Sequence, residues 1–284
     1  MAIYTNQATL SYNNVVVNSN IATGEILEVL NIQKSALNSF YDNNSIITYV
    51  LTLNNTGSNV LTDLTVTDNL GAYVYNTLTL VPLTYVDGSI RYLVNGVLQT
   101  PPTVVPGPPF QVTGVTVPAN GNVAILYQAT PNNFAPISNG STITNTATVD
   151  GGGLTNPVAS TTSLPAATVP VLSIVKSISP IPVVENGTVT YTFVISNSST
   201  APATVDENVV LTDTFNPILS NLNVAFNGVT WVEGTNYTYN QTTGLFTSSN
   251  GAITVPAATV VQDPTTGAYT VTPGTSTLVI SGTI

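Results

Sequence analysis

One block of sequence occurs twice in this chain of 284 residues, and it constrains the possible folds more than any other feature. The first copy runs from Leu30 to Leu70 and the second from Leu172 to Phe215. The positions that the copies share are Lys34, Tyr49, Asn55 and Asp68 in the first and Lys176, Tyr191, Asn197 and Asp213 in the second. Because a repeated block of this kind corresponds to a repeated structural unit, the sequence predicts two copies of one domain.

The composition indicates that both domains are built from β-strands. Charged residues make up only 6% of the chain, against about 25% in an average globular protein. The apolar residues are β-branched and interleaved with Thr, Ser and Asn, which is typical of strands. No apolar run approaches the roughly 20 residues of a membrane-spanning helix. We therefore expect an all-β protein with sandwiches over residues 26–150 and 171–284, a strand tail and connector over 151–170, and an N-terminal strand followed by a linker over 1–25.

The repeated lysines are unusual because the chain has only three basic residues. Alternation along the strand puts Lys34 on the same face as Ile32, which is the face expected to be buried. Lysine is rarely buried unless it is paired. One interpretation is a structural ion pair that was copied together with the repeat. The pairs would be Lys34 with Asp68 and Lys176 with Asp213.

The other interpretation is covalent chemistry. Burial removes the charge of a lysine and places a proton on a carboxyl group. A neutral amine is a nucleophile, and a protonated carboxyl can donate a hydrogen bond to an amide carbonyl and stabilise the oxyanion that develops there. With an asparagine side chain between the two groups, the amine would displace ammonia and form a Lys–Asn isopeptide bond. The reaction would be autocatalytic and would need no cofactor.

Each lysine–aspartate pair should therefore have an asparagine partner, and the first domain offers one. Its last strand reads STITNTATVDG, with Asn145 between Ile143 and Ala147 at alternate positions. We expect an intramolecular isopeptide bond between Lys34 and Asn145, with Asp68 as the proton donor and acceptor.

The second domain has no such strand, and a similar segment stands at the start of the chain instead. The final residues, TSTLVISGTI, match Gly121–Thr130, the strand that precedes the one with Asn145. Residues Ala2–Tyr12 share the pattern T-N-x-A-T with the strand of Asn145. A sandwich without its last strand exposes an unpaired edge, which the N-terminal strand of another copy would fill by β-augmentation.

Such a contact is head-to-tail and does not close on itself, so it would propagate a filament. Asn6 of one subunit would then meet Lys176 of the next, and we expect an intermolecular isopeptide bond between them with Asp213 as the proton donor and acceptor. The alternative is that Ala2–Tyr12 folds back onto its own domain.

The composition also excludes several classes of function. The chain has no cysteine and no histidine, so disulfides, thiolate or imidazole zinc sites and histidine triads are excluded. A net charge of −10 disfavours nucleic acid as a partner. Asp87 and Glu233 stand beside glycines in similar V-[DE]-G-[ST] turns, which is a more usual place for turn residues than for catalytic carboxylates. We expect no enzyme activity, no cofactor and no metal site.

The repeat resembles a known family. The motifs L-x-I-x-K-S, Y-x-[FIV]-x-[IVL]-x-N, V-x-[LV]-[ST]-D and T-N-x-A-T-V are similar to those of the conserved-repeat family of bacterial cell-surface proteins called domain of unknown function eleven. Asn44 stands where the family has a turn glycine, and Gly187 keeps that glycine in the second copy. The resemblance implies immunoglobulin-like β-sandwiches, of which the second would lack its last strand.

A narrower resemblance is to the 29-kDa subunits of the ribbon-like appendages on clostridial endospores. The chain has two repeats and a mass of 29.5 kDa, and its first residues lack the basic and apolar regions of a secretory signal. The resemblance implies a subunit that is made in the mother-cell cytoplasm and assembled on the spore surface.

The leading hypothesis is a structural subunit of an extracellular fibre or spore appendage, whose partner is another copy of itself and whose filaments could pair laterally. The alternative is a cell-surface adhesin or carbohydrate-binding module, which exposed aromatic side chains would favour. The chain has 13 tyrosines but a single tryptophan, Trp231. Concentration-dependent fibre formation would distinguish the two hypotheses.

Overall fold

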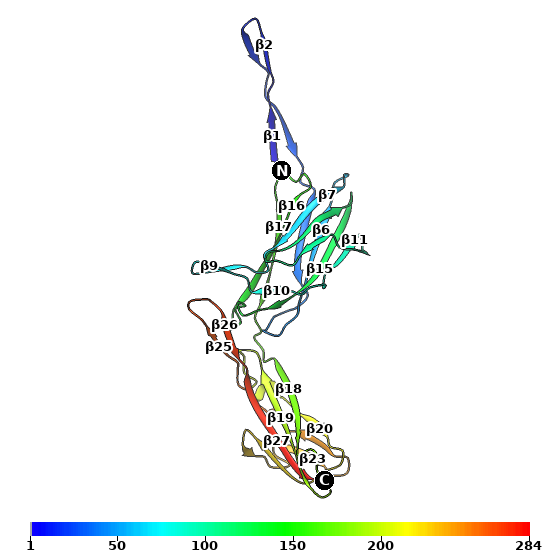
Figure 1. Ribbon diagram of the computed structural model, residues 1–284, viewed down its shortest axis with the longest axis vertical. Coiled ribbons are helices and arrows are strands. Elements are labelled where there is room, and N and C mark those ends of the chain that lie inside the picture. The colour runs from blue at the N-terminus through cyan, green and yellow to red at the C-terminus, as the bar shows by residue number, and fades with distance from the viewer. Residues whose placement is uncertain (1) are drawn as a thin grey trace. The chain divides into compact units, whose positions relative to one another are not determined.

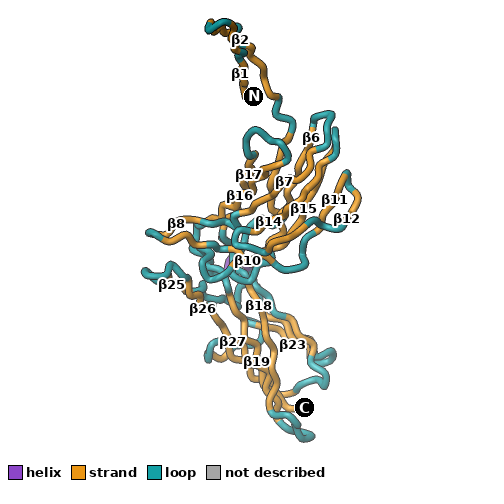
Figure 2. The backbone as a smooth tube through the Cα atoms, turned by 45° about the horizontal axis from the view of Figure 1, so that its top comes forward, coloured by secondary structure: helices purple, strands orange, loops and turns teal. Residues whose placement is uncertain are grey.

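The computed structural model describes residues 2–284, and its regular elements are almost all β-strands (Figure 2). Within that range the helical element is a single short 3-10 turn, η1 (Val205–Glu207). The chain divides into two compact units. Unit 1 comprises the residues up to Asn38 together with Ile46–Thr130 and Thr144–Ser163, and unit 2 comprises Ser39–Ser45, Pro131–Ile143 and Leu164–Ile284. The expected all-β fold is confirmed.

Unit 1 is a sandwich of two antiparallel sheets. The first sheet has the strand order β12-β11-β15-β6-β5, with β10 also paired to β15, and the second has the order β13-β14-β7-β16-β17. The strands of the first sheet are β5 (Leu30–Ala36), β6 (Ile47–Asn55), β10 (Leu83–Tyr85), β11 (Arg91–Val94), β12 (Val97–Gln99) and β15 (Gly121–Pro131). Those of the second are β7 (Leu61–Asp68), β13 (Thr103–Val105), β14 (Phe110–Val117), β16 (Thr142–Gly151) and β17 (Val158–Pro165), and a small hairpin joins β8 (Tyr73–Tyr75) to β9 (Leu78–Leu80).

The two sheets of unit 1 pack face to face because every second side chain of their strands is apolar. Along β6 the odd-numbered residues from Ile47 to Leu53 are buried, while their neighbours are partly exposed. The sheets meet at aromatic contacts such as Phe110 of β14 against Tyr127 of β15, with ring centroids 4.7 Å apart. This alternation is the period of two that a half-buried strand requires.

The N-terminal residues form a hairpin of their own rather than one strand and a linker (Figure 1). Its strands are β1 (Ala2–Asn6), β2 (Thr9–Tyr12), β3 (Val15–Asn18) and β4 (Ala22–Ile26); β1 pairs with β4 and β2 with β3. The turn residues Asn13 and Asn14 both have positive φ, 44° and 65°, as two-residue hairpin turns require. The valines that follow favour strand structure, and so the residues expected to form a linker supply the second arm.

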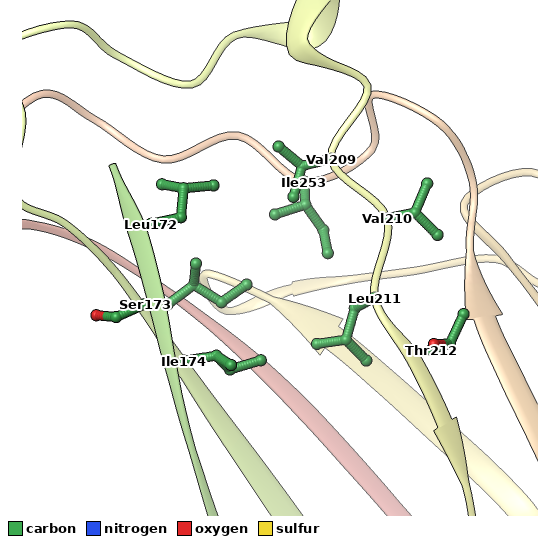
Figure 3. A pocket seen from close by; sticks show the side chains of 9 residues that line it. Leu172, Ser173, Ile174, Val209, Val210, Leu211, Thr212 and Ile253 are labelled. Atoms are coloured by element: carbon green, nitrogen blue, oxygen red, sulfur yellow. The ribbon is translucent and has the colours of Figure 1, made fainter. Parts of the chain in front are cut away.

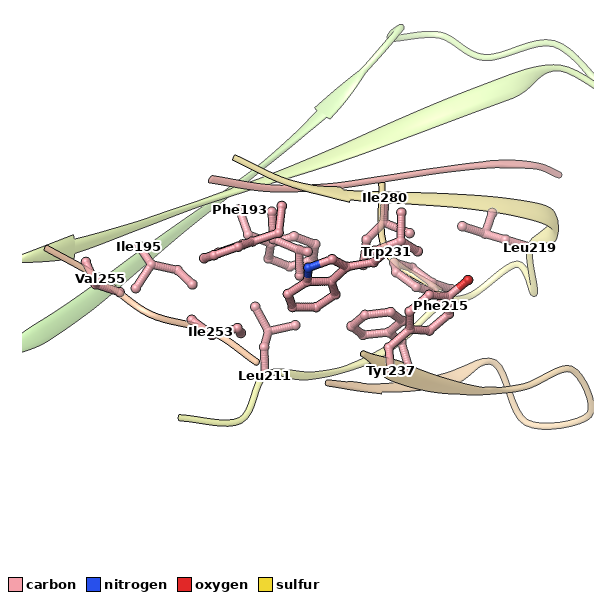
Figure 4. Close-up of a cluster of buried hydrophobic side chains, with 14 of the residues drawn as sticks. Phe193, Ile195, Leu211, Phe215, Leu219, Trp231, Tyr237, Ile253, Val255 and Ile280 are labelled. Carbon is pink, nitrogen blue, oxygen red and sulfur yellow. The ribbon is translucent and has the colours of Figure 1, made fainter. Parts of the chain in front are cut away.

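Unit 2 repeats the sandwich with fewer strands. Its larger sheet has the order β18-β19-β27-β21-β22, its smaller one the order β20-β24-β23, and β25 pairs with β26. The strands are β18 (Leu172–Ser179), β19 (Thr188–Asn197), β20 (Thr212–Thr214), β21 (Ser220–Phe226), β22 (Val229–Thr230), β23 (Tyr237–Asn240), β24 (Leu245–Ser248), β25 (Thr259–Gln262), β26 (Tyr269–Thr272) and β27 (Gly274–Thr283). Trp231, Phe193 and Phe215 lie together in the core between the sheets (Figure 4).

The repeated asparagines explain why the two units share a turn. The side-chain Nδ2 of Asn55 donates to the carbonyl oxygens of Asn59 (2.7 Å) and Pro118 (3.0 Å). That of Asn197 donates to the carbonyl oxygens of Ala201 (2.7 Å) and Pro256 (3.2 Å). Both side chains are buried, and a buried amide must be hydrogen-bonded. These asparagines therefore close the loop that follows β6 in unit 1 and β19 in unit 2.

Unit 2 lacks the strand that completes unit 1. In unit 1, Asp68 of β7 pairs with Phe110 of β14 on one side and with Ala147 of β16 on the other. In unit 2, Asp213 of β20 pairs with Phe246 of β24, and within residues 2–284 no strand pairs with the opposite edge of β20. The expectation of a second sandwich without its last strand is confirmed. β17, which lies in the stretch expected to be a strand tail and connector, also has no counterpart in unit 2.

Candidate functional site

Lys34 lies inside the sandwich of unit 1. Alternation along β5 turns it inward beside Leu51 of β6, its partner in the ladder. Only 4% of the residue is exposed. Its Nζ atom lies 4.6 Å from the centre of the Tyr49 ring, donates to Asp68 Oδ2, and donates to Tyr127 Oη at 2.6 Å. The sequence predicted the burial and the pairing with Asp68.

Asp68 stands at the end of β7, with both carboxylate oxygens engaged. Oδ2 accepts hydrogen bonds from Lys34 Nζ and from the Tyr127 hydroxyl, the latter at 2.5 Å. Oδ1 accepts from the backbone N–H of Leu70 at 2.9 Å. The carboxyl group is therefore held in one orientation with one oxygen against the amine.

Asn145 completes the group from β16. It is fully buried between Ile143 and Ala147. Its Nδ2 atom donates to Tyr127 Oη at 3.2 Å, and its Oδ1 atom accepts from the backbone N–H of Gly71 at 3.3 Å. The structure thus brings Lys34 and Asn145 to the same phenolic oxygen. A backbone N–H already lies at the amide oxygen, where negative charge would develop during attack on the carbonyl.

Tyr127 is the residue of this candidate site that sequence reasoning did not identify. It reaches the site from β15, and its hydroxyl donates to Asp68 while accepting from Lys34 and Asn145. Inward alternation along β15 was visible in the sequence, but it marked Tyr127 only as a core residue. Its counterpart in unit 2 is Ile280, because Tyr127 pairs with Tyr49 and Ile280 pairs with Tyr191.

Burial in this site favours the uncharged forms of Lys34, Tyr49 and Tyr127. Burial lowers the pKa of the Lys34 amine, and the attraction of Asp68 opposes the effect. Burial raises the pKa of Tyr127 well above its usual range, and the nearby Asp68 raises it further. Burial also raises the pKa of Tyr49, against a smaller opposing interaction with the Asn145 amide. Both tyrosines therefore remain phenols at neutral pH, and the amine is closer to its nucleophilic form than an exposed lysine.

The second pair, in unit 2, is only half enclosed. Lys176 Nζ donates to Asp213 Oδ2 at 2.5 Å, but 42% of the lysine side chain is exposed. The amine lies over the rings of Tyr191 and Phe193, at 4.7 and 5.4 Å from their centres. Asn6, the partner predicted for this lysine, is exposed on β1 opposite Ala22. The intermolecular bond remains a prediction.

An apolar groove of about 340 Å³ opens beside the second pair. Leu172 and Ile174 of β18 line one side of it, and Leu211 and Val209 from the segment before β20 line the other (Figure 3). Ile253 also lines it. The groove adjoins the edge of β20 that has no partner strand, the edge that corresponds to the one covered by β16 in unit 1.

The described residues contain no group of three or more carboxylates that could hold a metal ion. Helices long and apolar enough to cross a membrane are likewise absent from residues 2–284.

No protein-family model matches the sequence, and no curated protein matches it. Similar solved structures include the pilus backbone RrgB of Streptococcus pneumoniae, with 12% identity and a TM-score of 0.35 over 86% of this chain and 55% of that one. The major pilin subunit BcpA of Bacillus cereus has 12% identity and a TM-score of 0.37, covering 96% and 73% of the two chains. A 35 kDa C-terminal fragment of the major pilin GBS80 of Streptococcus agalactiae has 10% identity and a TM-score of 0.35, covering 87% and 91%.

The chain spans about half the length of the RrgB structure. With TM-scores this low, the similarity carries no argument about function, and the assignment rests on the residues of the two lysine sites.

One prediction concerns the newly found tyrosine. Changing Tyr127 to phenylalanine should slow cross-linking of Lys34 to Asn145 by about 100-fold, the usual contribution of a positioned proton-transfer group. The measurement is a time course of the intact mass after refolding, which follows the loss of one ammonia. Tyr85→Phe is the control, because this ring packs against Phe110 in the same core but its hydroxyl is not bonded to Lys34 or Asn145. Equal rates for the two variants would remove Tyr127 from the chemistry.

Proposed function

We propose that this chain is a structural subunit of an extracellular fibre, which polymerises head-to-tail and is locked by isopeptide bonds. The observation that carries the proposal is the contrast between the two repeated sites. The Lys34 site has a lysine, an aspartate and an asparagine enclosed together. The Lys176 site has the lysine and the aspartate but lies open beside a groove with a free strand edge. A segment that carries the missing asparagine stands exposed at the other end of the chain.

The chemistry at the enclosed site balances without a co-reactant. The Lys34 amine attacks the side-chain carbonyl carbon of Asn145, and a carbon–nitrogen bond forms while the amide oxygen takes negative charge beside the Gly71 N–H. Asp68 takes the proton that the amine loses. That proton then passes to the departing Nδ2 group, for which the Tyr127 hydroxyl is the nearest relay. Ammonia leaves, and the product is one amide bond.

The same chemistry joins two subunits when Asn6 of one copy enters the site of Lys176 and Asp213 in the next. Strand donation places Asn6 where Asn145 lies in unit 1, because both belong to the same T-N-x-A-T pattern. The proposal includes membership of the cell-surface repeat family and a place among spore appendages, both of which rest on the sequence resemblance alone. The adhesin alternative gains no support from the single tryptophan, because Trp231 is buried in the core of unit 2.

The test is the mass of the assembled material. Fibres of the unaltered chain should resist hot detergent and give a ladder of covalent oligomers. Each chain should have lost one ammonia internally, and each joint between two subunits should account for the loss of one more. Lys176→Ala should still assemble, because strand donation does not need the amine, but its fibres should fall apart to monomers in hot detergent.

Arg91→Ala is the matched control, because it removes a cation at an exposed position of unit 1 and should leave the ladder intact. A ladder that persists in Lys176→Ala would place the bond elsewhere. If the unaltered chain forms no fibres at any concentration, the proposed function is wrong.

A further inference from the structure

In unit 1 two strands, β16 and β17, cover the side of the sandwich that is open in unit 2. β16 and β17 lie side by side, with Thr144 Oγ1 at 3.0 Å from Ser163 Oγ and Thr146 Oγ1 at 2.9 Å from Thr161 Oγ1. β16 pairs with β7 in the second sheet. β17 lies beyond it and reaches the edge of the first sheet.

A hydrogen bond at Lys34 links β17 to the first sheet. The backbone N–H of Lys34 donates to Ser160 Oγ at 2.9 Å. β17 thereby covers the edge of β5 that faces away from β6, and Lys34 is enclosed from that side as well as by β16.

Unit 2 lacks both strands, and β18 shows the consequence. On β5 Lys34 is buried and Ile32 is partly buried, whereas the matching residues of β18, Lys176 and Ile174, are both exposed, Ile174 to 54%. A single donated strand beside β20 would fill the place of β16. It would leave β18 without the cover that β17 gives to β5.

The N-terminal hairpin has the two arms that are needed. Its first arm, β1 and β2, carries Asn6 and Ala8 in the pattern that Asn145 and Ala147 follow in β16. Its second arm, β3 and β4, runs back beside the first as β17 runs back beside β16.

The serine at the lysine recurs in this second arm. Thr146 of β16 lies opposite Thr161 of β17, so the next residue of β16, Ala147, lies opposite Ser160. In the hairpin Ser19 lies opposite Ala8, whose N–H donates to Ser19 Oγ at 2.9 Å. Ser19 precedes Lys34 by 15 residues, and Ser160 precedes Lys176 by 16. Each repeat is thus preceded by a hairpin with a serine at nearly the same distance from its lysine.

The composition of the hairpin fits burial better than exposure. Glu25 is the one charged residue of the hairpin, and residues 2–24 contain none, so burying the hairpin up to Gly24 would desolvate no ion. Leu10 and Tyr12, which share a face with Asn6 by alternation, are 65% and 54% exposed in the single chain. A lone two-stranded hairpin is marginally stable in water, and an uncharged exposed one invites pairing.

We infer that the element donated between subunits is the whole hairpin Ala2–Ile26. Its first arm pairs beside β20 and fills the groove, and its second arm covers β18, with Ser19 Oγ accepting from the Lys176 N–H of the next copy. This inference rests on the proposed function, because it specifies the joint by which the fibre would grow.

The inference can be tested with engineered thiols, because the chain has no cysteine. The variant carries Ser19→Cys and Val175→Cys on a Lys176→Ala background, which removes the isopeptide ladder. A short cross-linker with a thiol-reactive group at each end should restore a ladder in fibres of this variant. Ser19→Cys alone should give none. A reference chain with Gln33→Cys and Ser160→Cys, the matching positions of unit 1, should cross-link only within one chain.

The outcomes separate this inference from the proposed function. If the reference chain cross-links and the double variant forms fibres without a ladder, the hairpin inference is overturned while single-strand donation stands. If the unaltered chain forms no fibres, both fail. If some other segment of the same chain fills the groove, the cysteine at position 175 should cross-link within one chain or not at all. Either result would also overturn the inference.

A second pair of variants applies if the thiol variants fail to assemble. Asn14→Gly keeps the positive φ of the hairpin turn, and this variant should assemble as the unaltered chain does. Asn14→Pro cannot adopt that conformation, and it should raise the concentration needed for fibres by at least about tenfold. Equal assembly of the two variants would show that the arms are not donated as one unit.

Discussion

Replacing Asn145 by alanine should lower the midpoint of thermal unfolding of unit 1, within the 284-residue chain, by roughly 10–20 °C. The proposed cross-link between Lys34 and Asn145 would close a loop of more than 100 residues. The chain-entropy estimate for a covalent loop of about 100 residues is about 4–5 kcal/mol. The hydrogen bond from the Gly71 N–H to the amide oxygen, which the cross-linked chain keeps and the variant loses, adds about 1 kcal/mol.

The control is the same substitution at the matching position of the hairpin. Asn6→Ala removes an exposed asparagine and should leave the unfolding midpoint of the monomer unchanged. Calorimetry measures the midpoints. Intact mass should show the unaltered chain one ammonia lighter than its sequence, and Asn145→Ala at the mass of its own sequence. An unaltered chain whose mass equals that of its sequence would contradict the cross-link. Lys34 and Asp68 would then be a buried ion pair, and the drop in midpoint would be a few degrees.

The second large effect is on assembly. Leu10→Asp should abolish fibres at concentrations where we expect the unaltered chain to assemble, because the charge would have to enter the apolar groove beside β20. Leu10 is 65% exposed in the single chain, so the substitution should not disturb folding of the monomer. An unpaired carboxylate in an apolar site carries a penalty of several kcal/mol, which corresponds to at least about a thousandfold weaker association.

The neighbouring residue gives the control. Ser11→Asp introduces the same charge one residue along the strand, where alternation turns the side chain to the opposite face. It should assemble normally. Deleting Ala2–Tyr12 should abolish fibres as Leu10→Asp does and leave the sandwich of unit 1 folded. Electron microscopy and sedimentation measure the result. Long filaments from the deleted chain, or equal assembly of Leu10→Asp and Ser11→Asp, would show that the strand is not donated.

The sequence by itself determined the features that depend on local pattern. The repeat predicted two domains, and the alternation of apolar residues with Thr, Ser and Asn predicted sandwiches. The same period of two turned Lys34 and Asn145 inward, because side chains of a strand point to opposite faces in turn. The absence of a second copy of the Asn145 strand predicted that unit 2 is incomplete, and the structure confirms this at the free edge of β20.

Only the tertiary structure determined which other groups surround Lys34 and Asn145. Tyr127 joins Lys34, Asp68 and Asn145 because four strands from two sheets converge there, and nothing in the spacing along the chain records that convergence. The Gly71 N–H that donates to the Asn145 amide oxygen comes from a loop. The direction of a loop N–H cannot be predicted from any periodicity of the sequence. The N-terminal hairpin was not predicted either, because the residues of β3 and β4 were expected to form a linker. Their pairing with β2 and β1 depends on a two-residue turn. Periodicity fixes the face on which a side chain lies, whereas the contact it makes depends on which strands the fold brings together.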